Sequence, residues 1–227
     1  MADQISLENY DQPLDYNLNK LRTSLSDLSP VIAVQHRLSE RFTLLFREQF
    51  ADIPFDTTQP RNKSNWTHHT YFAIRTTAKA LALDCTFETM GRLDAVIETF
   101  SEYPGVILLA EWESDAFSVF GSGNELEKLW SGVNEHDHAD AFLFTYCPLD
   151  SLYDFTKQVV EFWQGRESAR QKQPSLFLTV VALGRIGRHE HFPFMRTIEI
   201  SPTTVALWYD ISFVDEEGYR NAIAITV

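Results

Sequence analysis

The chain has 227 residues, of which 44% are hydrophobic, and this is enough to build a substantial core. Its formal net charge of −13 argues against a protein that coats nucleic acid non-specifically, because such proteins neutralise phosphates with an excess of Lys and Arg. No apolar stretch is long enough to cross a membrane, no signal peptide is visible, and only two cysteines occur. We therefore expect a cytoplasmic globular protein.

The first 90 residues are predicted to be mainly helical. Apolar residues recur at the helical period in residues 31–50, where Leu38, Phe42 and Phe46 fall on one face. A second helix is predicted for residues 68–83 and a shorter one for residues 15–28.

Two β-strands are predicted in the sequence GRLDAVIETFSEYPGVILLAEWE, residues 91–113. Residues 93–98 and 106–110 are apolar and partly β-branched, and the sequence SEYPG between them is typical of a turn. The second run is continuously apolar, which indicates a central strand covered on both faces.

Acidic residues lie at the ends of these two strands. Glu111 and Glu113 are two residues apart and therefore share one face of the strand, with Trp112 on the other. If the strands pair, Asp94 approaches the same face. Three converging carboxylates raise one another's pKa unless a cation lies among them, and oxygen ligands suit Mg²⁺, Mn²⁺ or Ca²⁺. The alternative is that both glutamates are simply exposed at a strand end.

The remaining chain alternates strands and helices before ending in β-structure. Asn124 is predicted to cap a helix, with Glu127 completing a capping box. The predicted helices cover residues 125–134 and 152–163, and the predicted strands cover residues 141–146, 176–183, 195–200, 204–214 and 219–227. With no internal repeat, we expect a single α/β domain with a mixed sheet, comprising a helical part (1–90), a core (91–183) and an additional C-terminal antiparallel β segment (184–227).

This order of elements resembles the PD-(D/E)xK nuclease superfamily. The likeness is carried by GRLDAVIE, VILLAEWE and the helix, strand, helix and strand that follow, and it implies a restriction endonuclease-like core. It is most similar to the branch that contains the GGATCC-cutting type II restriction enzyme, where glutamate replaces the usual lysine, as Glu113 does here. Leu93 stands where the family's proline is expected.

The resemblance implies a role for each residue of the motif. Asp94 and Glu111 would bind Mg²⁺ or Mn²⁺, the backbone carbonyl of Trp112 would be a further metal ligand, and Glu113 would orient or deprotonate the attacking water. Family members often add an acid from an upstream element, and three candidates stay open: Glu40, Glu48 and Glu88.

The implied function is that of a metal-dependent DNA endonuclease, and reading a palindrome would also require a homodimer. Basic residues that could contact phosphates gather in residues 165–196, namely Arg166, Arg170, Lys172, Arg185, Arg188 and Arg196. The alternative is a catalytically inactive protein with the same core that acts as a protein-binding or regulatory module, which the net charge favours.

Overall fold

The computed structural model describes residues 32–52, 63–89, 93–100, 105–120, 124–168, 173–186, 189–208 and 210–213. Its helices are α2 (Ile32–Asp52), α3 (Lys63–Ala80), α4 (Glu125–Glu135) and α5 (Leu152–Gln164), with short 3-10 helices η2 (Ala116–Phe120) and η3 (Leu149–Ser151). Its strands are β1 (Leu83–Thr89), β2 (Leu93–Thr99), β3 (Val106–Glu113), β4 (Asp140–Pro148), β5 (Leu176–Ile186), β6 (His189–His191), β7 (Phe194–Ile200), β8 (Val205–Leu207) and β9 (Ile211–Ser212).

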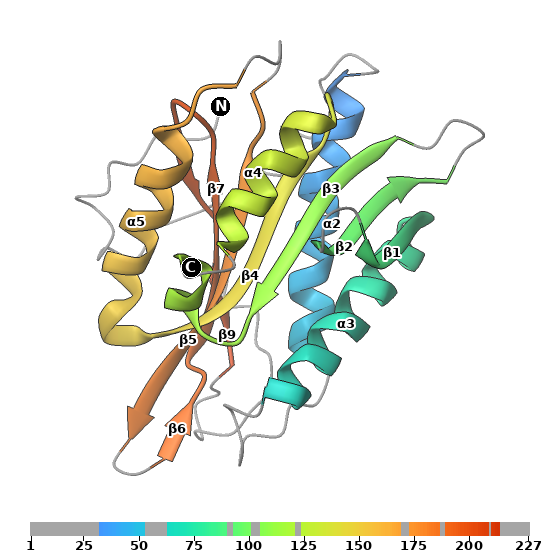
Figure 1. The fold of residues 1–227 in the computed structure, drawn as a ribbon. Coiled ribbons are helices and arrows are strands. Elements are labelled where there is room, and N and C mark those ends of the chain that lie inside the picture. The colour runs from blue at the N-terminus through green and yellow to red at the C-terminus, as the bar shows by residue number, and fades with distance from the viewer. Residues whose placement is uncertain are drawn as a thin grey trace.

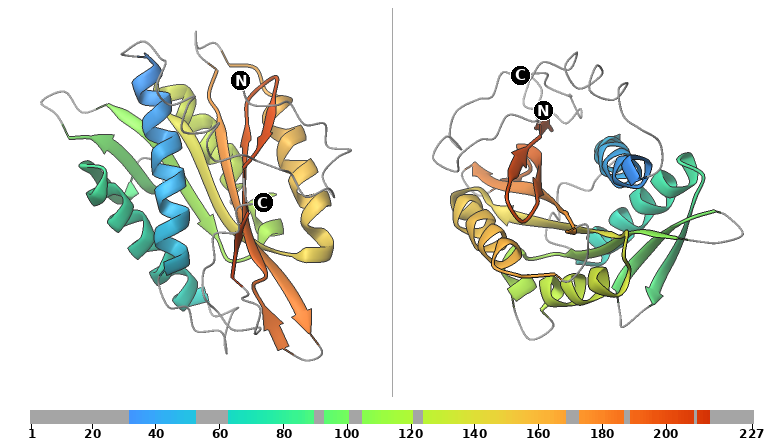
Figure 2. Two further views of the ribbon diagram at one scale, coloured as in Figure 1. Left: turned by 180° about the vertical axis from the view of Figure 1, so that it is seen from behind. Right: turned by 90° about the horizontal axis from the view of Figure 1, so that it is seen from above.

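All of these strands belong to one mixed sheet. The strand order is β1-β2-β3-β4-β5-β7-β8, with β6 added to β5 and β9 added to β7. The three central strands β3, β4 and β5 are parallel, and the other neighbours are antiparallel. Helices α4 and α5 cover one face, and α2 and α3 cover the other (Figures 1 and 2). The prediction of an α/β protein with a mixed sheet is confirmed.

The layer of α2 and α3 packs on the sheet through aromatic rings. Phe46 of α2 meets Phe142 and Phe144 of β4 edge to face, with ring centroids 5.0 and 4.9 Å apart. Trp66 of α3 stacks on Phe144 at 4.7 Å. All four rings are buried, and full burial of a side chain of the size of Phe stabilises the fold by about 1.5–3 kcal/mol. This aromatic contact therefore fixes both helices against the central strand.

The layer of α4 and α5 packs on the opposite face, and α4 comes unusually close to the sheet. A Cβ atom at Gly132 would lie 2.7 Å from Leu109 Cδ1 on β3 and 3.4 Å from Leu93 Cδ1 on β2. Real Cβ atoms do not approach a neighbour as closely as the first distance. The absent side chain at Gly132 therefore sets how near α4 can lie to β3.

Strand β1 was missed in the sequence, where residues 68–83 were predicted to form one helix. The helix instead spans Lys63–Ala80, and the strand begins at Leu83. The alternation is visible in burial, since Leu83, Cys85 and Phe87 are half-buried while the residues between them are exposed. A period of two over so short a stretch is a weaker signal than the helical pattern that precedes it.

The C-terminal segment contains antiparallel β-strands, as predicted, and it extends the central sheet, because β7 pairs directly with β5. The single strand predicted for residues 204–214 is two short strands, β8 and β9, which both pair with β7. The predicted strand 219–227 and helix 15–28 lie outside the described residues. Of the helices that are described, none has the length and apolar character needed to span a membrane.

We predict that Gly132→Val destabilises the protein by about 1–3 kcal/mol, because the new side chain overpacks the contact with Leu109. Urea unfolding measures the change. The control is Ser131→Val, which adds a similar side chain at the preceding, exposed position of the same helix. An equal effect of both substitutions would show that close packing at Gly132 does not matter.

Candidate active site

The β2–β3 hairpin brings two of the predicted acids together. The strands pair antiparallel with Ala95 opposite Ala110, which sets Asp94 opposite Glu111. Asp94 Oδ2 accepts a hydrogen bond of 2.9 Å from the backbone N–H of Trp112. A strand residue projects its N–H and C=O from the same edge, so the Trp112 carbonyl also faces β2. The expected proximity of Asp94, Glu111 and the Trp112 backbone is therefore present.

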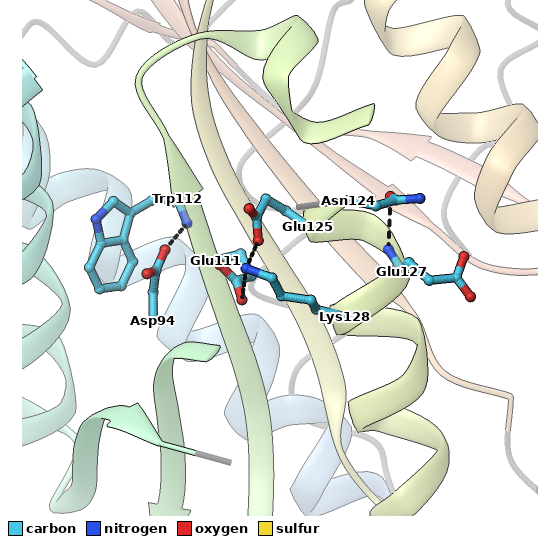
Figure 3. A network of polar contacts seen from close by, with 7 residues as sticks. All are labelled: Asp94, Glu111, Trp112, Asn124, Glu125, Glu127 and Lys128. Atoms are coloured by element: carbon cyan, nitrogen blue, oxygen red, sulfur yellow. Dashed lines mark hydrogen bonds and ion pairs between the residues drawn. The ribbon is translucent and has the colours of Figure 1, made fainter. Parts of the chain in front are cut away.

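Helix α4 adds two charged groups that the sequence did not suggest. Figure 3 shows Lys128 and Glu125 reaching from its first turns toward Glu111. Lys128 Nζ lies 3.8 Å from Glu111 Oε1 and forms a closer ion pair with Glu125. Glu111 and Glu125 are both buried, and Lys128 is partly buried. The site is a cluster of three acids, Asp94, Glu111 and Glu125, around one ammonium group.

The position of Lys128 follows from two local features of α4. Asn124, in a left-handed conformation with φ of 37°, accepts a hydrogen bond from the Glu127 N–H at 3.1 Å and starts the helix at Glu125. Gly132 lies one turn after Lys128 on the same face. Since Gly132 sits over Leu109, and Glu111 is two residues further along β3, the close approach of α4 brings Lys128 to Glu111.

The carboxyl groups are poorly neutralised in this arrangement. Burial, together with the charges of Asp94 and Glu125, raises the pKa of Glu111 to about 10, against the opposing effect of Lys128. Burial also raises the pKa of Asp94, while the Trp112 N–H lowers it. The hydrogen bond between the two carboxyl groups raises the pKa of Glu111 and lowers that of Asp94, so a shared proton stays on Glu111.

The pKa of the ammonium group is also raised, and for an amine this favours the charged form. Burial works against its charge, but the hydrogen bond to Glu125 and the charges of Glu111, Glu125 and Asp94 raise the pKa of Lys128. Lys128 therefore stays charged. Even so, Glu111 Oε1 is buried and, within the described part of the chain, accepts no hydrogen bond.

The three upstream glutamates are placed differently by the fold. Glu40 and Glu48 belong to α2, which covers the face of the sheet opposite to α4, so neither shares the face of Glu111 (Figure 2). Glu88 is flanked by the pairs Phe87–Ala95 and Thr89–Leu93 and thus lies opposite Asp94 in the register, but it is exposed and has a φ of 54°. The acid that the structure adds to the pair is Glu125.

Glu113 is half-buried at the end of β3, where it pairs in register with Thr145. Its suggested role toward water stays a prediction. Among the described residues, no group of three or more His, Cys, Asp or Glu side chains is arranged to hold a metal ion. The role of Asp94, Glu111 and the Trp112 carbonyl as metal ligands also stays a prediction.

Two arginines expected to contact phosphates are occupied by carboxylates. Arg166 binds both oxygens of Glu127, the residue that was predicted to complete a capping box. Arg196 binds both oxygens of Asp210 at 2.9 and 2.7 Å. Arg170, Lys172 and Arg188 lie outside the described residues. The basic segment 165–196 is thus partly used in internal ion pairs.

No protein-family model, no curated protein and no solved structure was found to match this chain.

We predict that Asp94→Ala is less stable than Asp94→Asn by about 1 kcal/mol, because only asparagine keeps an acceptor for the Trp112 N–H. Both variants remove the same charge, so their difference isolates this hydrogen bond. Urea unfolding with EDTA present, followed by tryptophan fluorescence, measures it. Equal stability of the two variants would show that the hydrogen bond contributes nothing.

We also predict that the metal-free protein loses stability as the pH rises. Folded Glu111 keeps its proton up to about pH 10, whereas the unfolded carboxyl loses it near 4.5. The unfolded state thus binds fewer protons in this window, and the free energy of unfolding falls by up to about 1.4 kcal/mol per pH unit.

Glu111→Gln should flatten this dependence and should be more stable than the wild type above neutral pH. The measurement is urea unfolding between about pH 6 and pH 8 in EDTA. Glu161→Gln is the control, since the Glu161 side chain is 63% exposed. An unchanged pH profile in Glu111→Gln would contradict the raised pKa.

Proposed function

We propose that this protein is a metal-dependent endonuclease that hydrolyses phosphodiester bonds of DNA, with Asp94 and Glu111 at its centre. The observation that carries the proposal is the buried Glu111 carboxyl, whose Oε1 accepts no hydrogen bond within the described chain and which faces two further acids and a single ammonium group. Burying this carboxyl costs the fold free energy, since a buried polar oxygen without a hydrogen bond is destabilising and Lys128 Nζ, at 3.8 Å, compensates it only in part.

A divalent cation would relieve this imbalance. The fit rests on the donor chemistry, because carboxylate and carbonyl oxygens are the ligands that Mg²⁺ and Mn²⁺ prefer. Asp94, Glu111 and the Trp112 carbonyl would hold the ion. When bound, it would neutralise a phosphate and lower the pKa of a water molecule.

The residues of the chain supply the rest of the chemistry. Lys128 remains charged beside Glu111 and is available to contact a phosphate oxygen. Glu125 holds the Lys128 ammonium group in position through their ion pair. Glu113, on the same strand face as Glu111, would accept a proton from the attacking water.

The arrangement of elements also supports the resemblance to the PD-(D/E)xK superfamily. Asp94 lies near the start of β2, the acid pair Glu111 and Glu113 ends β3, and α4 then leads to β4, which is parallel to β3. The expected lysine is missing from β3, but Lys128 brings an ammonium group to the same carboxylates from α4. A pair of carboxylates and one lysine would thus be supplied by three elements, β2, β3 and α4.

A second candidate is a catalytically inactive protein with this core that binds a protein partner. It is favoured by the same ion pairs, because Lys128 already compensates part of the acidic charge without a metal. The net charge of −13 is also more typical of a protein-binding surface than of a DNA-binding one. Binding of metal separates the two candidates.

We predict that the wild type binds Mn²⁺ in calorimetric titration and cleaves DNA when Mg²⁺ or Mn²⁺ is present. Asp94→Asn and Glu111→Gln should lose metal binding, and cleavage should fall by about 100-fold or more. Lys128→Met should keep metal binding but lose cleavage, because it removes a phosphate contact and not a ligand. Glu161→Gln, which alters an exposed acid on α5, is the matched control.

A wild type that binds no metal would favour the non-catalytic candidate. Metal binding that persists in both Asp94→Asn and Glu111→Gln would show that the metal binds at other residues. An RNA substrate of the same sequence, tested in parallel, shows whether the site cleaves DNA, RNA or both.

A further inference from the structure

A second recess lies at the edge of the sheet, away from the acidic cluster. Helix α3 runs along the edge strand β1 (Figure 1), and between them is a groove of about 650 Å³. Its lining includes Tyr71, Arg75 and Lys79 of α3, Asp84, Cys85 and Phe87 of β1, and Phe100 after β2. It opens on the face covered by α2 and α3, whereas Glu111 lies on the face covered by α4. We call it the α3–β1 groove.

The groove contains two cations that form no ion pair with a carboxylate in the described part of the chain. Arg75 and Lys79 are exposed and lie one helical turn apart, about 6 Å along the axis. Within the described part of the chain, no carboxylate pairs with either, whereas Lys128, Lys157, Arg166 and Arg196 all form ion pairs. Unpaired cations on a protein with a net charge of −13 mark a surface suited to an anion.

Aromatic side chains flank the pair of cations on both sides. At one end Tyr71 and Phe87 pack with ring centroids 4.2 Å apart, and Arg75 Nη1 donates to Tyr71 Oη at 3.4 Å. At the other end Phe100 is 84% exposed. The neighbouring Phe72 is 55% exposed. Exposed rings beside unpaired cations are the combination that binds unstacked bases and their phosphates.

The groove is less suited to an added peptide strand. Strand β1 is at the end of the strand order, where a peptide could extend the sheet. However, the Asp84 carboxylate accepts a hydrogen bond of 2.8 Å from the Cys85 N–H. A charged side chain that occupies an edge N–H is a feature that discourages strand addition. Side chains, not the backbone edge, therefore provide the binding groups.

We propose that the α3–β1 groove binds an unpaired nucleic-acid strand, with Arg75 and Lys79 on phosphates and Phe100 stacked on a base. Duplex is disfavoured because its bases are already stacked and cannot reach the rings. This binding goes beyond the proposed hydrolysis, since it uses neither Asp94 nor Glu111 and requires no metal. It would give an acidic protein a local means of holding a polyanion.

The test is fluorescence anisotropy with labelled oligo-dT and oligo-U at low salt in EDTA, which separates strand binding from any metal-dependent cleavage. The wild type should bind single strands with an affinity that falls as salt increases. The double variant Arg75→Ala/Lys79→Ala should reduce the slope of log K against log salt by about 1.4, at about 0.7 per phosphate contact. Phe100→Ala should weaken binding by about tenfold.

Tyr153→Ala and Lys157→Ala are the matched controls, because they remove an exposed aromatic ring and a cation at the same four-residue spacing on α5. They should leave binding unchanged.

The affinities for oligo-dT and oligo-U decide between DNA and RNA. The proposal is wrong if the wild type binds neither strand, binds duplex equally well, or loses no affinity in the groove variants. Thermal melts check that each variant is folded. If the double variant is unfolded, Lys79→Glu is tested in its place, because it also removes a positive charge from the groove.

Discussion

Burial of the central strands on both faces is the constraint on which the rest of this structure depends. All residues of β4 except Pro148 are buried, and β3 is buried throughout except at its two ends. Parallel strands of this kind are stable only when helices cover both faces. The chain meets this need with an aromatic layer on one side, centred on Phe46, Trp66 and Phe144, and a more aliphatic layer on the other, in which Gly132 allows α4 to approach closely.

Of the acids buried in this layered core, Asp140 and Glu111 differ in how their oxygens are satisfied. Asp140, at the start of β4, accepts hydrogen bonds from the Ser39 hydroxyl at 2.7 Å and the Ser175 N–H at 3.0 Å. It therefore links α2, β4 and the segment before β5, which is a structural role. Glu111 has an oxygen that accepts no hydrogen bond in the described structure, and its pKa is strongly raised. Burial of Glu111 therefore costs free energy without linking elements of the fold, and this distinguishes it as a candidate functional carboxyl from the structural Asp140.

The distribution of cations gives a second distinction. Arg166 and Arg196 lie in the basic segment that the sequence suggested for phosphate contacts, but both bind carboxylates of their own chain. Arg75 and Lys79 lie outside that basic segment. They are nevertheless the cations that line a groove together with exposed rings. Availability of a charge, more than its local density, decides whether it can meet a ligand.

The sequence by itself determined the elements whose pattern is local. The β2–β3 hairpin, β4, β5, α4 and α5 were predicted from apolar periodicity and turn residues, and the hairpin was enough to bring Asp94 to Glu111, because antiparallel register follows from a short connection. Only the tertiary structure decided that Lys128 and Glu125 join this pair. Their approach depends on how closely α4 crosses β3, which Gly132 permits and no linear spacing reveals. The upstream acids Glu40 and Glu48 could not be ranked for the same reason, since the side of the sheet on which a helix packs is set by contacts distant in sequence.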